Sequence, residues 1–130
     1  GAGRERATSA SPLEPKIGFS RAIRSGAYVA VSGTAPIGDD GATVGVGDVA
    51  AQTRRCFAVA LGALEQVGAA AQHVVRTRVL LRDINRWTEA AAVHGELFAQ
   101  VRPACTFVEV SRFIDPEWLV EVELDAVVED

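Results

Sequence analysis

The spacing of the apolar residues changes near the middle of the chain, and this change limits what the chain can fold into. Between residues 49 and 64, apolar and small side chains recur every three or four positions, which predicts an amphipathic helix. From Val75 to Leu81 they alternate with residues that are mostly arginine, which predicts a strand with one wet or interfacial side. A long helix followed at once by a strand indicates a mixed fold of helices and strands in this chain of 130 residues.

The predicted first helix carries a capping residue at each end. Asp48 can cap its N-terminus, and the helix is expected to run to about Val67. Gly68 stands where a residue in the left-handed conformation commonly ends a helix. Cys56 lies on the apolar face of this helix, so we expect it to be a packing residue.

A second helix is predicted between the arginine-rich strand and Pro103. Asp83 or Asn85 can cap it, and the proline excludes a helix that continues past Arg102. The face expected to point inward consists of Trp87, Ala90, Ala91, His94, Leu97 and Phe98. The two tryptophans of the chain, Trp87 and Trp118, are expected to be core anchors, with the wall of a pocket as the alternative role.

Four further segments have the composition of strands. Residues 21–24 and 28–32 flank a glycine and predict a hairpin, and residues 105–110 and 119–128 are joined by a loop near Pro116. The expected order is therefore ββαβαββ, an α+β fold with two helices on one face of a sheet. Residues 28–32 and 105–110 are apolar on both sides, so a second subunit is expected to cover the other face.

Composition narrows the domain organisation and the possible ligands. With 48% hydrophobic residues, residues 16–130 are expected to form a single domain, preceded by a flexible segment over residues 1–15. The net charge of −4 argues against nucleic-acid binding, which needs a basic face. Two cysteines and two histidines without metal-ligand spacing argue against a zinc site. Neither a long apolar run nor a signal-peptide core is present, which predicts a cytoplasmic protein that binds no membrane.

Short fragments in a fixed order resemble the RidA/YjgF family of reactive enamine and imine deaminases. The fragments are Ile17-Gly18, Val31-Ser32-Gly33, Gly47-Asp48, Ala51-Gln52-Thr53, Val74-Val75-Arg76-Thr77, Asp83-Ile84, Arg102-Pro103-Ala104 and Val120-Glu121-Val122-Glu123. The resemblance runs from about Lys16 to Val128. It implies a chorismate mutase-like α+β fold, a homotrimer with ligand clefts between subunits, and cofactor-free hydrolysis of 2-aminoacrylate-like enamines and their imines.

One position departs from the family pattern in a way that bears on substrate binding. The family keeps an arginine directly after Pro-Ala, and it binds the substrate carboxylate through two charge-assisted hydrogen bonds. In this chain that position is Cys105. Arg102 is the nearest replacement, but a surface or intersubunit salt bridge is its more ordinary role. A cysteine nucleophile with His94 as its base is a further alternative to a small buried cysteine.

The resemblance also assigns the remaining candidate site residues. Glu121 matches the family glutamate that positions or activates the hydrolytic water, with a solvated strand glutamate as the alternative. The residues expected to bind substrate are Ser20, Gly33, Thr34, His94, Arg102, Cys105 and Thr106. Ser20 offers a hydroxyl near the place of a family tyrosine, and a glycine such as Gly33 at a strand end lets a ligand approach the backbone. The alternative role of His94 is that of a core or interface histidine whose ring nitrogens are hydrogen-bonded within the protein.

Two functions from different classes follow from these residues. The first is a divergent hydrolase with deaminase-like activity on a small imine, enamine or related metabolite, whose activity on 2-aminoacrylate itself is weak or absent. The second is a non-catalytic trimer that binds a small metabolite or has a regulatory role. Ribonuclease activity, attached to some members of the family, ranks third because of the acidic charge.

Overall fold

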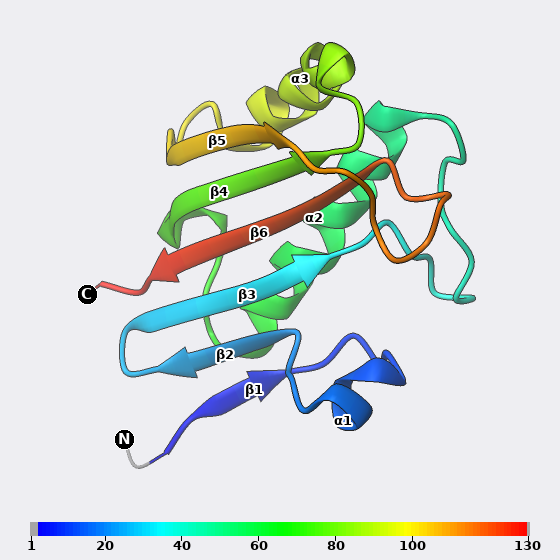
Figure 1. Ribbon diagram of the computed structural model, residues 1–130. Helices are drawn as coiled ribbons and strands as arrows, with labels where there is room; N and C mark the ends of the chain where they lie inside the picture. Colours follow the sequence, from blue (N-terminus) through cyan, green and yellow to red (C-terminus); the bar gives the residue numbers. More distant parts are fainter. Residues whose placement is uncertain (1–2, 130) are drawn as a thin grey trace.

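A computed structural model describes residues 3–129 and contains one mixed six-stranded sheet. The spatial order of the strands is β1-β2-β3-β6-β4-β5 (Figure 1). Their bounds are Glu5–Ala7 for β1, Ala22–Ser25 for β2, Tyr28–Thr34 for β3, Val74–Leu81 for β4, Ala104–Glu109 for β5 and Val120–Val127 for β6. Neighbouring strands pair in antiparallel fashion except β4 and β5, which are parallel.

The two long helices cover one face of this sheet, which confirms the predicted arrangement. These are α2 (Val49–Gln66) and α3 (Trp87–Phe98), and both lie behind the sheet in Figure 1. A short helix, α1 (Leu13–Ile17), precedes β2, and 3-10 turns at Ala71–His73 and Ile84–Arg86 lead into β4 and α3. Within residues 3–129, no helix has the combination of length and apolar character that is needed to cross a membrane.

Both predicted caps of α2 are present. The Asp48 carboxylate accepts a hydrogen bond of 3.0 Å from the backbone N–H of Ala51, as an N-terminal cap does. Gly68 has a φ of 77°, and the following N–H, that of Ala69, donates to Leu64 O at 2.9 Å. This left-handed residue closes the helix because a glycine adopts that conformation without a steric penalty.

Strand β6 lies between β3 and β4, although β5 precedes it in the sequence. The connection from β4 through α3 returns the chain to the same end of the sheet, so β5 pairs parallel to β4 at the edge. The loop of residues 110–119 then carries the chain past β4 to the middle of the sheet. Gln52 ties that loop to α2, donating to Glu117 O at 2.9 Å and accepting from Leu119 N at 2.8 Å.

Buried residues alternate along β6 and pack against α2. Val120, Val122 and Leu124 are each 0% exposed, and they belong to one core cluster with Cys56 and Phe57 of α2. Cys56 is therefore a packing residue, as expected, and desolvation raises its pKa well above the ordinary value. The core is continuous from the hairpin β2–β3 to β4, which fixes the register of the central strands.

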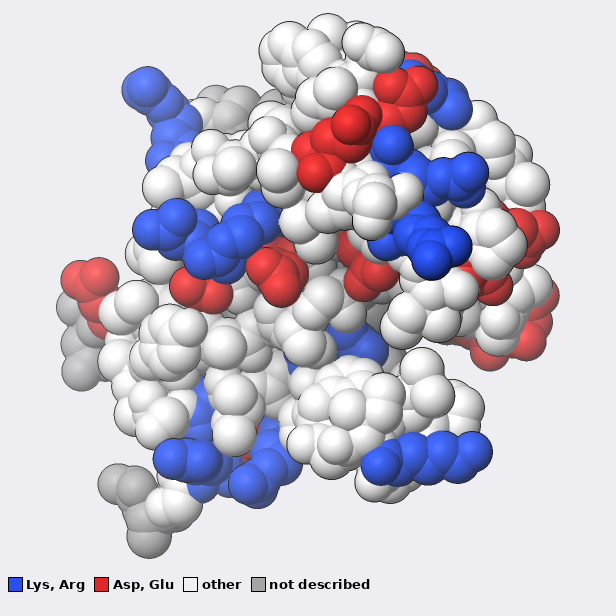
Figure 2. All heavy atoms as spheres, viewed as in Figure 1, with Lys and Arg blue, Asp and Glu red and all other residues white. Residues whose placement is uncertain are grey.

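The other face of the sheet, which the long helices leave uncovered, carries charged side chains along its middle strand, β6. The sequence predicts apolar surface on this face at residues 28–32 and 105–110. The alternate residues of β6, Glu121, Glu123 and Asp125, are half-buried on this face, and Arg78 of β4 lies 3.5 Å from Glu123. Figure 2 shows acidic side chains across the centre of this face with basic side chains beside them. Val108 of the edge strand β5 is 41% exposed.

Within the N-terminal segment of residues 1–15, which the sequence predicts to be flexible, a short strand forms and a short helix begins. Glu5–Ala7 form β1 on the edge of the sheet, and α1 begins at Leu13. The reason is a cap that sequence periodicity does not reveal: the buried Glu14 carboxylate accepts from Thr8 Oγ1 at 2.8 Å, from Ser9 Oγ at 2.8 Å and from Ser9 N at 3.0 Å. Residues 1, 2 and 130 lie outside the described part of the chain.

We predict that Glu14→Gln lowers the free energy of unfolding by about 1–2 kcal/mol at neutral pH, because charge-assisted hydrogen bonds are lost. Desolvation raises the pKa of Glu14, but the hydrogen bonds from Ser9, Thr8 and Ser11 outweigh it and hold the pKa below the ordinary value. Stability from a lowered carboxyl pKa is present above the unfolded pKa and is lost as the pH falls through the folded pKa. Urea unfolding at neutral and acidic pH measures both effects.

The matched control for this prediction is Glu5→Gln, a change to an exposed carboxylate on β1. It should leave the free energy of unfolding nearly unchanged. If Glu14→Gln cost as much in acid as at neutral pH, the ionised carboxylate would not be the stabilising group.

Candidate functional site

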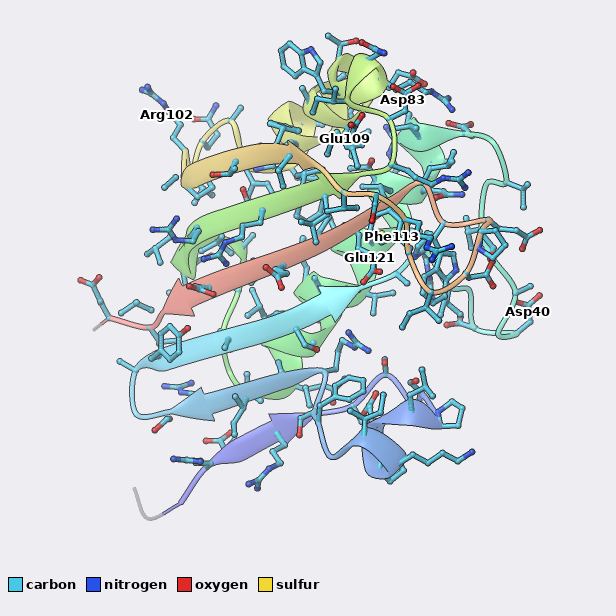
Figure 3. The ribbon with its side chains drawn as sticks, viewed as in Figure 1. Asp40, Asp83, Arg102, Glu109, Phe113 and Glu121 are labelled. Atoms are coloured by element: carbon cyan, nitrogen blue, oxygen red, sulfur yellow. The ribbon has the colours of Figure 1, made fainter. Side chains whose placement is uncertain are left out.

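Glu121 stands at the start of β6, on the face that the long helices do not cover. Its neighbours Val120 and Val122 are fully buried on the helix side, which confirms the predicted orientation. The backbone partner of Glu121 across β4 is Leu80. In Figure 3, Glu121 lies at the end of the sheet where β3 finishes and β6 begins. This end collects polar groups from β3, from β6 and from the residues just before β2.

Gly33 lets the Glu121 carboxylate rest against strand β3. The pairing of β3 with β6 shifts register between Val31 and Thr34, so one extra residue is accommodated there. A Cβ built at Gly33 would come within 3.1 Å of Glu121 Oε1. The close approach that the sequence predicts at this glycine is thus made by a carboxylate of the same chain.

Arg21 is a site residue that the sequence analysis missed. It is only 7% exposed, and its Nη1 donates to Ser32 Oγ at 3.1 Å, to Thr34 Oγ1 at 3.3 Å and to the Gly33 carbonyl. Its Nε donates to Ser9 Oγ at 3.1 Å. An arginine at the start of a strand has no periodicity of its own, so the sequence carried no signal for its burial.

Opposing effects set the protonation of Glu121. Desolvation raises the pKa of its carboxyl, the positive charge of Arg21 lowers it, and the neighbouring carboxylate Glu123 raises it, with a net increase. A carboxyl whose pKa is raised towards neutrality is suited to general acid and base chemistry.

Two further predicted site residues, Ser20 and Thr34, lie before β2 and at the end of β3, and both hydrogen-bond within the fold, Ser20 through its backbone carbonyl and Thr34 through its hydroxyl. The Ser20 carbonyl accepts from Ser32 Oγ at 3.1 Å. Thr34 is 1% exposed, and its hydroxyl donates to Ser32 O at 2.8 Å and accepts from Arg21. Thr34 therefore shapes the strand end rather than presenting a hydroxyl to solvent.

Cys105 and Thr106 lie on the exposed edge strand β5. Cys105 pairs with Thr77 of β4 and Thr106 with Arg78, so the two side chains point to opposite sides of the sheet. The expectation that Cys105 is a small buried hydrophobe is wrong, because the thiol lies on an edge strand and is exposed.

His94 lies on the inner side of α3, as predicted, and is held there by a buried partner. Its Nε2 is 2.8 Å from Oγ1 of Thr77, a residue that is fully buried. The rings of Phe57, Phe98 and Phe107 surround the imidazole, with centroids 5.7, 4.8 and 6.2 Å away. Desolvation lowers the pKa of His94. Among the described residues no hydrogen bond joins His94 to Cys105, so the paired nucleophile and base are not formed within one chain.

Trp87 and Trp118 differ from the expected core anchors. Trp87 is 46% exposed, because α3 begins at this residue after a 3-10 turn, and its ring packs edge-on against Phe107 at 5.8 Å. Trp118 is half-buried, and its Nε1 has no hydrogen-bond partner within residues 3–129.

Arg102 is an exposed residue that turns the chain from α3 into β5. It has a φ of 54°, and its N–H donates to Phe98 O at 2.8 Å, which closes the end of the helix. The alternation of an extended strand therefore does not apply between residues 102 and 105. In Figure 3 its side chain points away from the sheet, at the end opposite to Glu121.

The candidate residues thus form two groups within one chain. The Glu121 half-site, defined as Ser20, Arg21, Gly33, Thr34 and Glu121, lies on the uncovered face at one end of the sheet. The Cys105 half-site, defined as His94 and Cys105, lies under α3, with Arg102 and Thr106 nearby in the chain. Two surface hollows of about 340 and 380 Å³ lie around Arg82, and neither is lined by a residue of the half-sites. Residues 3–129 contain no cluster of three or more His, Cys, Asp or Glu side chains that could hold a metal ion.

Comparison with known proteins gives a consistent result over almost the whole chain. The sequence model of the family described as Endoribonuclease L-PSP matches residues 9–128. The crystal structure of Rv2704 from Mycobacterium tuberculosis, a member of the YjgF/YER057c/UK114 family, is 43% identical with a TM-score of 0.87. That match covers 97% of this chain and 100% of Rv2704.

Two relatives add sequence context. An uncharacterised protein of Streptomyces coelicolor is 39% identical over 121 residues, which are 93% of this chain and 90% of the relative. The 3-aminoacrylate deaminase RutC of Acinetobacter baylyi is 32% identical over 111 residues, 85% of each chain.

We predict that Gly33→Ala moves the Glu121 carboxylate while the fold is kept. Gly33 does not have a left-handed φ, and the only close neighbour of the added Cβ is the flexible end of a glutamate side chain. The free energy of unfolding should therefore change by less than about 1 kcal/mol. The carboxyl ¹³C resonance of Glu121 should shift. Gly62→Ala, at a helical glycine with nothing within 4 Å, is the control that should leave this resonance unmoved.

We predict that His94→Phe costs about 1–3 kcal/mol of stability, because it leaves the buried Thr77 hydroxyl without its partner. Adding Thr77→Val should recover part of this loss, and unfolding of both single variants and the double variant measures the coupling. Strictly additive costs would contradict the pairing.

The same variants test the titration of His94. Because burial lowers its folded pKa, the unfolded chain binds the proton first as the pH falls, so stability should decline below the unfolded pKa of histidine. His94→Phe should remove this part of the decline, as measured by unfolding at several pH values.

Proposed function

Because this chain belongs to the Endoribonuclease L-PSP family, which includes the YjgF and RutC proteins, we propose that it is a cofactor-free hydrolase of small imines, enamines or related metabolites. The observation that carries this proposal is the half-buried Glu121 carboxyl, whose pKa is raised and whose position against Gly33 is fixed by the fold. The deaminase activity of the relative RutC supports the reaction class.

In this proposal Glu121 moves protons between water and the substrate nitrogen. As the water oxygen bonds to the imine carbon, the carboxylate takes a proton from the water, and the C=N π electrons move to nitrogen, which receives that proton. A second transfer, from the new hydroxyl to nitrogen, allows the C–N bond to break. Ammonia leaves and a carbonyl forms, so atoms and charge balance without a cofactor.

The substrate is proposed to be neutral or less acidic than 2-aminoacrylate. The position of the family arginine is Cys105, whose thiol is a weak donor without a fixed charge. Loss of a charge-assisted pair in a dry cleft costs roughly 2–5 kcal/mol of binding. Activity on 2-aminoacrylate is therefore expected to be weak or absent.

A homotrimer is proposed to complete the site. The Glu121 half-site and the Cys105 half-site lie apart within one chain, and both are at surfaces that a neighbouring subunit can reach. Joining the first half-site of one subunit to the second half-site of its neighbour produces a cleft with Glu121, His94 and Cys105 around one ligand, while the Thr106 side chain points to the other side of β5. The net charge of −4 supports a small metabolite rather than nucleic acid as that ligand.

One observation favours a second function, a non-catalytic trimer that binds a small metabolite. Cys105 supplies no fixed charge, and in the other half-site the Thr34 hydroxyl is used within the fold. Such a protein would hold a ligand in the same cleft without releasing ammonia.

The test is ammonia release from freshly generated 2-aminoacrylate by the wild type, Cys105→Arg and Cys105→Arg with Glu121→Gln. We expect weak release by the wild type, stronger release by Cys105→Arg because the carboxylate is again bound, and its loss on adding Glu121→Gln, by about 100-fold or more. Asp125→Asn, at a half-buried carboxylate on the same face of β6 that is not among the groups shifting the pKa of Glu121, is the matched control and should keep activity.

Other outcomes separate the two functions. Full activity of the wild type would mean that another group compensates for Cys105. No release by the wild type or by Cys105→Arg, together with no turnover of neutral imines, would contradict the hydrolase and support the binding protein.

A further inference from the structure

Arg21 is the most buried cation described in this structure, and it reaches three consecutive residues of β3. Its Nη1 donates to the Ser32 hydroxyl at 3.1 Å, to the Gly33 carbonyl and to the Thr34 hydroxyl at 3.3 Å. These are the residues at which β3 shifts its register against β6. A planar guanidinium can hold several acceptors at once in a fixed geometry, so Arg21 sets the shape of this bulge.

The bulge in turn supports the Glu121 carboxylate. Gly33 at its centre is the residue that Glu121 Oε1 approaches, to 3.1 Å from where a Cβ would stand. Arg21 therefore acts on Glu121 in two ways. It holds the backbone on which the carboxylate rests, and it places a positive charge close to that carboxylate in a partly desolvated region.

The charge of Arg21 is already shared between carboxylates of the chain. Glu14 and Glu121 both interact electrostatically with it, and Ser9 connects the Arg21 guanidinium to Glu14, donating to Glu14 Oε2 at 2.8 Å. Counting Arg21 as one positive charge and the two carboxylates as two negative charges, no positive charge is left over for a substrate carboxylate. This distinguishes Arg21 from a clamp that replaces the missing arginine at position 105.

We propose that Arg21 is a positioning residue that holds the Ser32–Thr34 bulge and the Glu121 carboxylate in their working geometry. This inference rests on the proposed hydrolase function for its kinetic part. It also gives Ser9 and Glu14 a role, because they complete the polar shell of a buried guanidinium.

Titration of Glu121 depends on groups from each element packed around it. Arg21 lies before β2, Glu123 lies on the same face of β6, and Leu80 is the non-titratable partner on β4. Cys56 of α2 lies on the buried side, where desolvation raises the pKa of its thiol and keeps it neutral. Arg21 is thus the group that favours the ionised carboxylate, against desolvation and Glu123.

The experiment compares Arg21→Gln, Arg21→Lys and Arg24→Gln. Arg24 is a matched control because it is a half-buried arginine of the same hairpin that donates to backbone carbonyls, those of Gly26 at 2.9 Å and Val67 at 2.8 Å. The first readout is the ¹³C titration of the Glu121 carboxyl, identified by its absence in Glu121→Gln. The second is the pH profile of kcat for ammonia release, in the Cys105→Arg background if the wild type is slow.

In Arg21→Gln, we expect the Glu121 midpoint and the acidic limb of the kcat profile to move together to higher pH. We expect kcat to fall on the order of 100-fold while KM changes little, because geometry rather than binding is lost. Arg21→Lys keeps the positive charge but loses the planar set of guanidinium N–H donors. It should therefore retain the midpoint of the Glu121 titration and lose on the order of tenfold in kcat. Arg24→Gln should lower Tm alone.

Three results would overturn the inference. The first is an unmoved Glu121 midpoint in Arg21→Gln with only a lowered Tm, which is the behaviour of a purely structural arginine. The second is a rise in KM for anionic substrates with kcat unchanged, which is the behaviour of a carboxylate clamp. If Arg21→Gln does not fold, an unchanged kcat in Arg21→Lys decides against positioning. Failure of all variants to release ammonia refutes the hydrolase alone, since the titration still tests the link between Arg21 and Glu121.

Discussion

The packing of β6 against α2 sets the chemistry of both faces of the molecule. Val120, Val122, Leu124 and Ala126 are fully buried on the helix side, and burial of each valine or leucine side chain stabilises the fold by about 1.5–3 kcal/mol. Because side chains alternate along a strand, this packing forces Glu121 and its neighbours onto the other face. A slip of one residue would place carboxylates in the core, so the register is strongly specified.

That arrangement leaves a sheet face with charge along its middle strand and apolar groups towards its edges. Exposed side chains such as Tyr28 and Val108 flank the acidic residues, and Arg78 pairs with Glu123. Burial of a carboxylate in an interface is costly unless the carboxylate is paired or hydrogen-bonded. On this face, Arg78 already provides such a pair for Glu123.

The polar shell around Arg21 links regions that are far apart in the sequence. Ser9, Glu14, Ser32 and Thr34 come from three separate segments, and each hydrogen-bonds within the same network. A buried guanidinium without these partners would be costly, so the network makes the N-terminal segment part of the domain rather than an appendage. The site carboxylate then depends on residues more than a hundred positions before it in the chain.

The spacing of apolar residues in the sequence predicted helix α2, strand β4 and the alternation of buried residues along β6, and capping residues predicted both ends of α2. The order of these elements predicted that both long helices lie on one face of the sheet. These features depend on neighbours within a few residues, where hydrophobic spacing and capping chemistry act directly. The sequence also identified Glu121, Gly33 and His94 as residues of interest. Only the tertiary structure decided that Arg21 is buried, that Cys105 and Trp87 are exposed, and that the candidate residues form two groups. The physical reason is that burial and electrostatic environment depend on which distant segments meet, and no local pattern records that Ser9, Glu14 and the bulge of β3 surround one guanidinium.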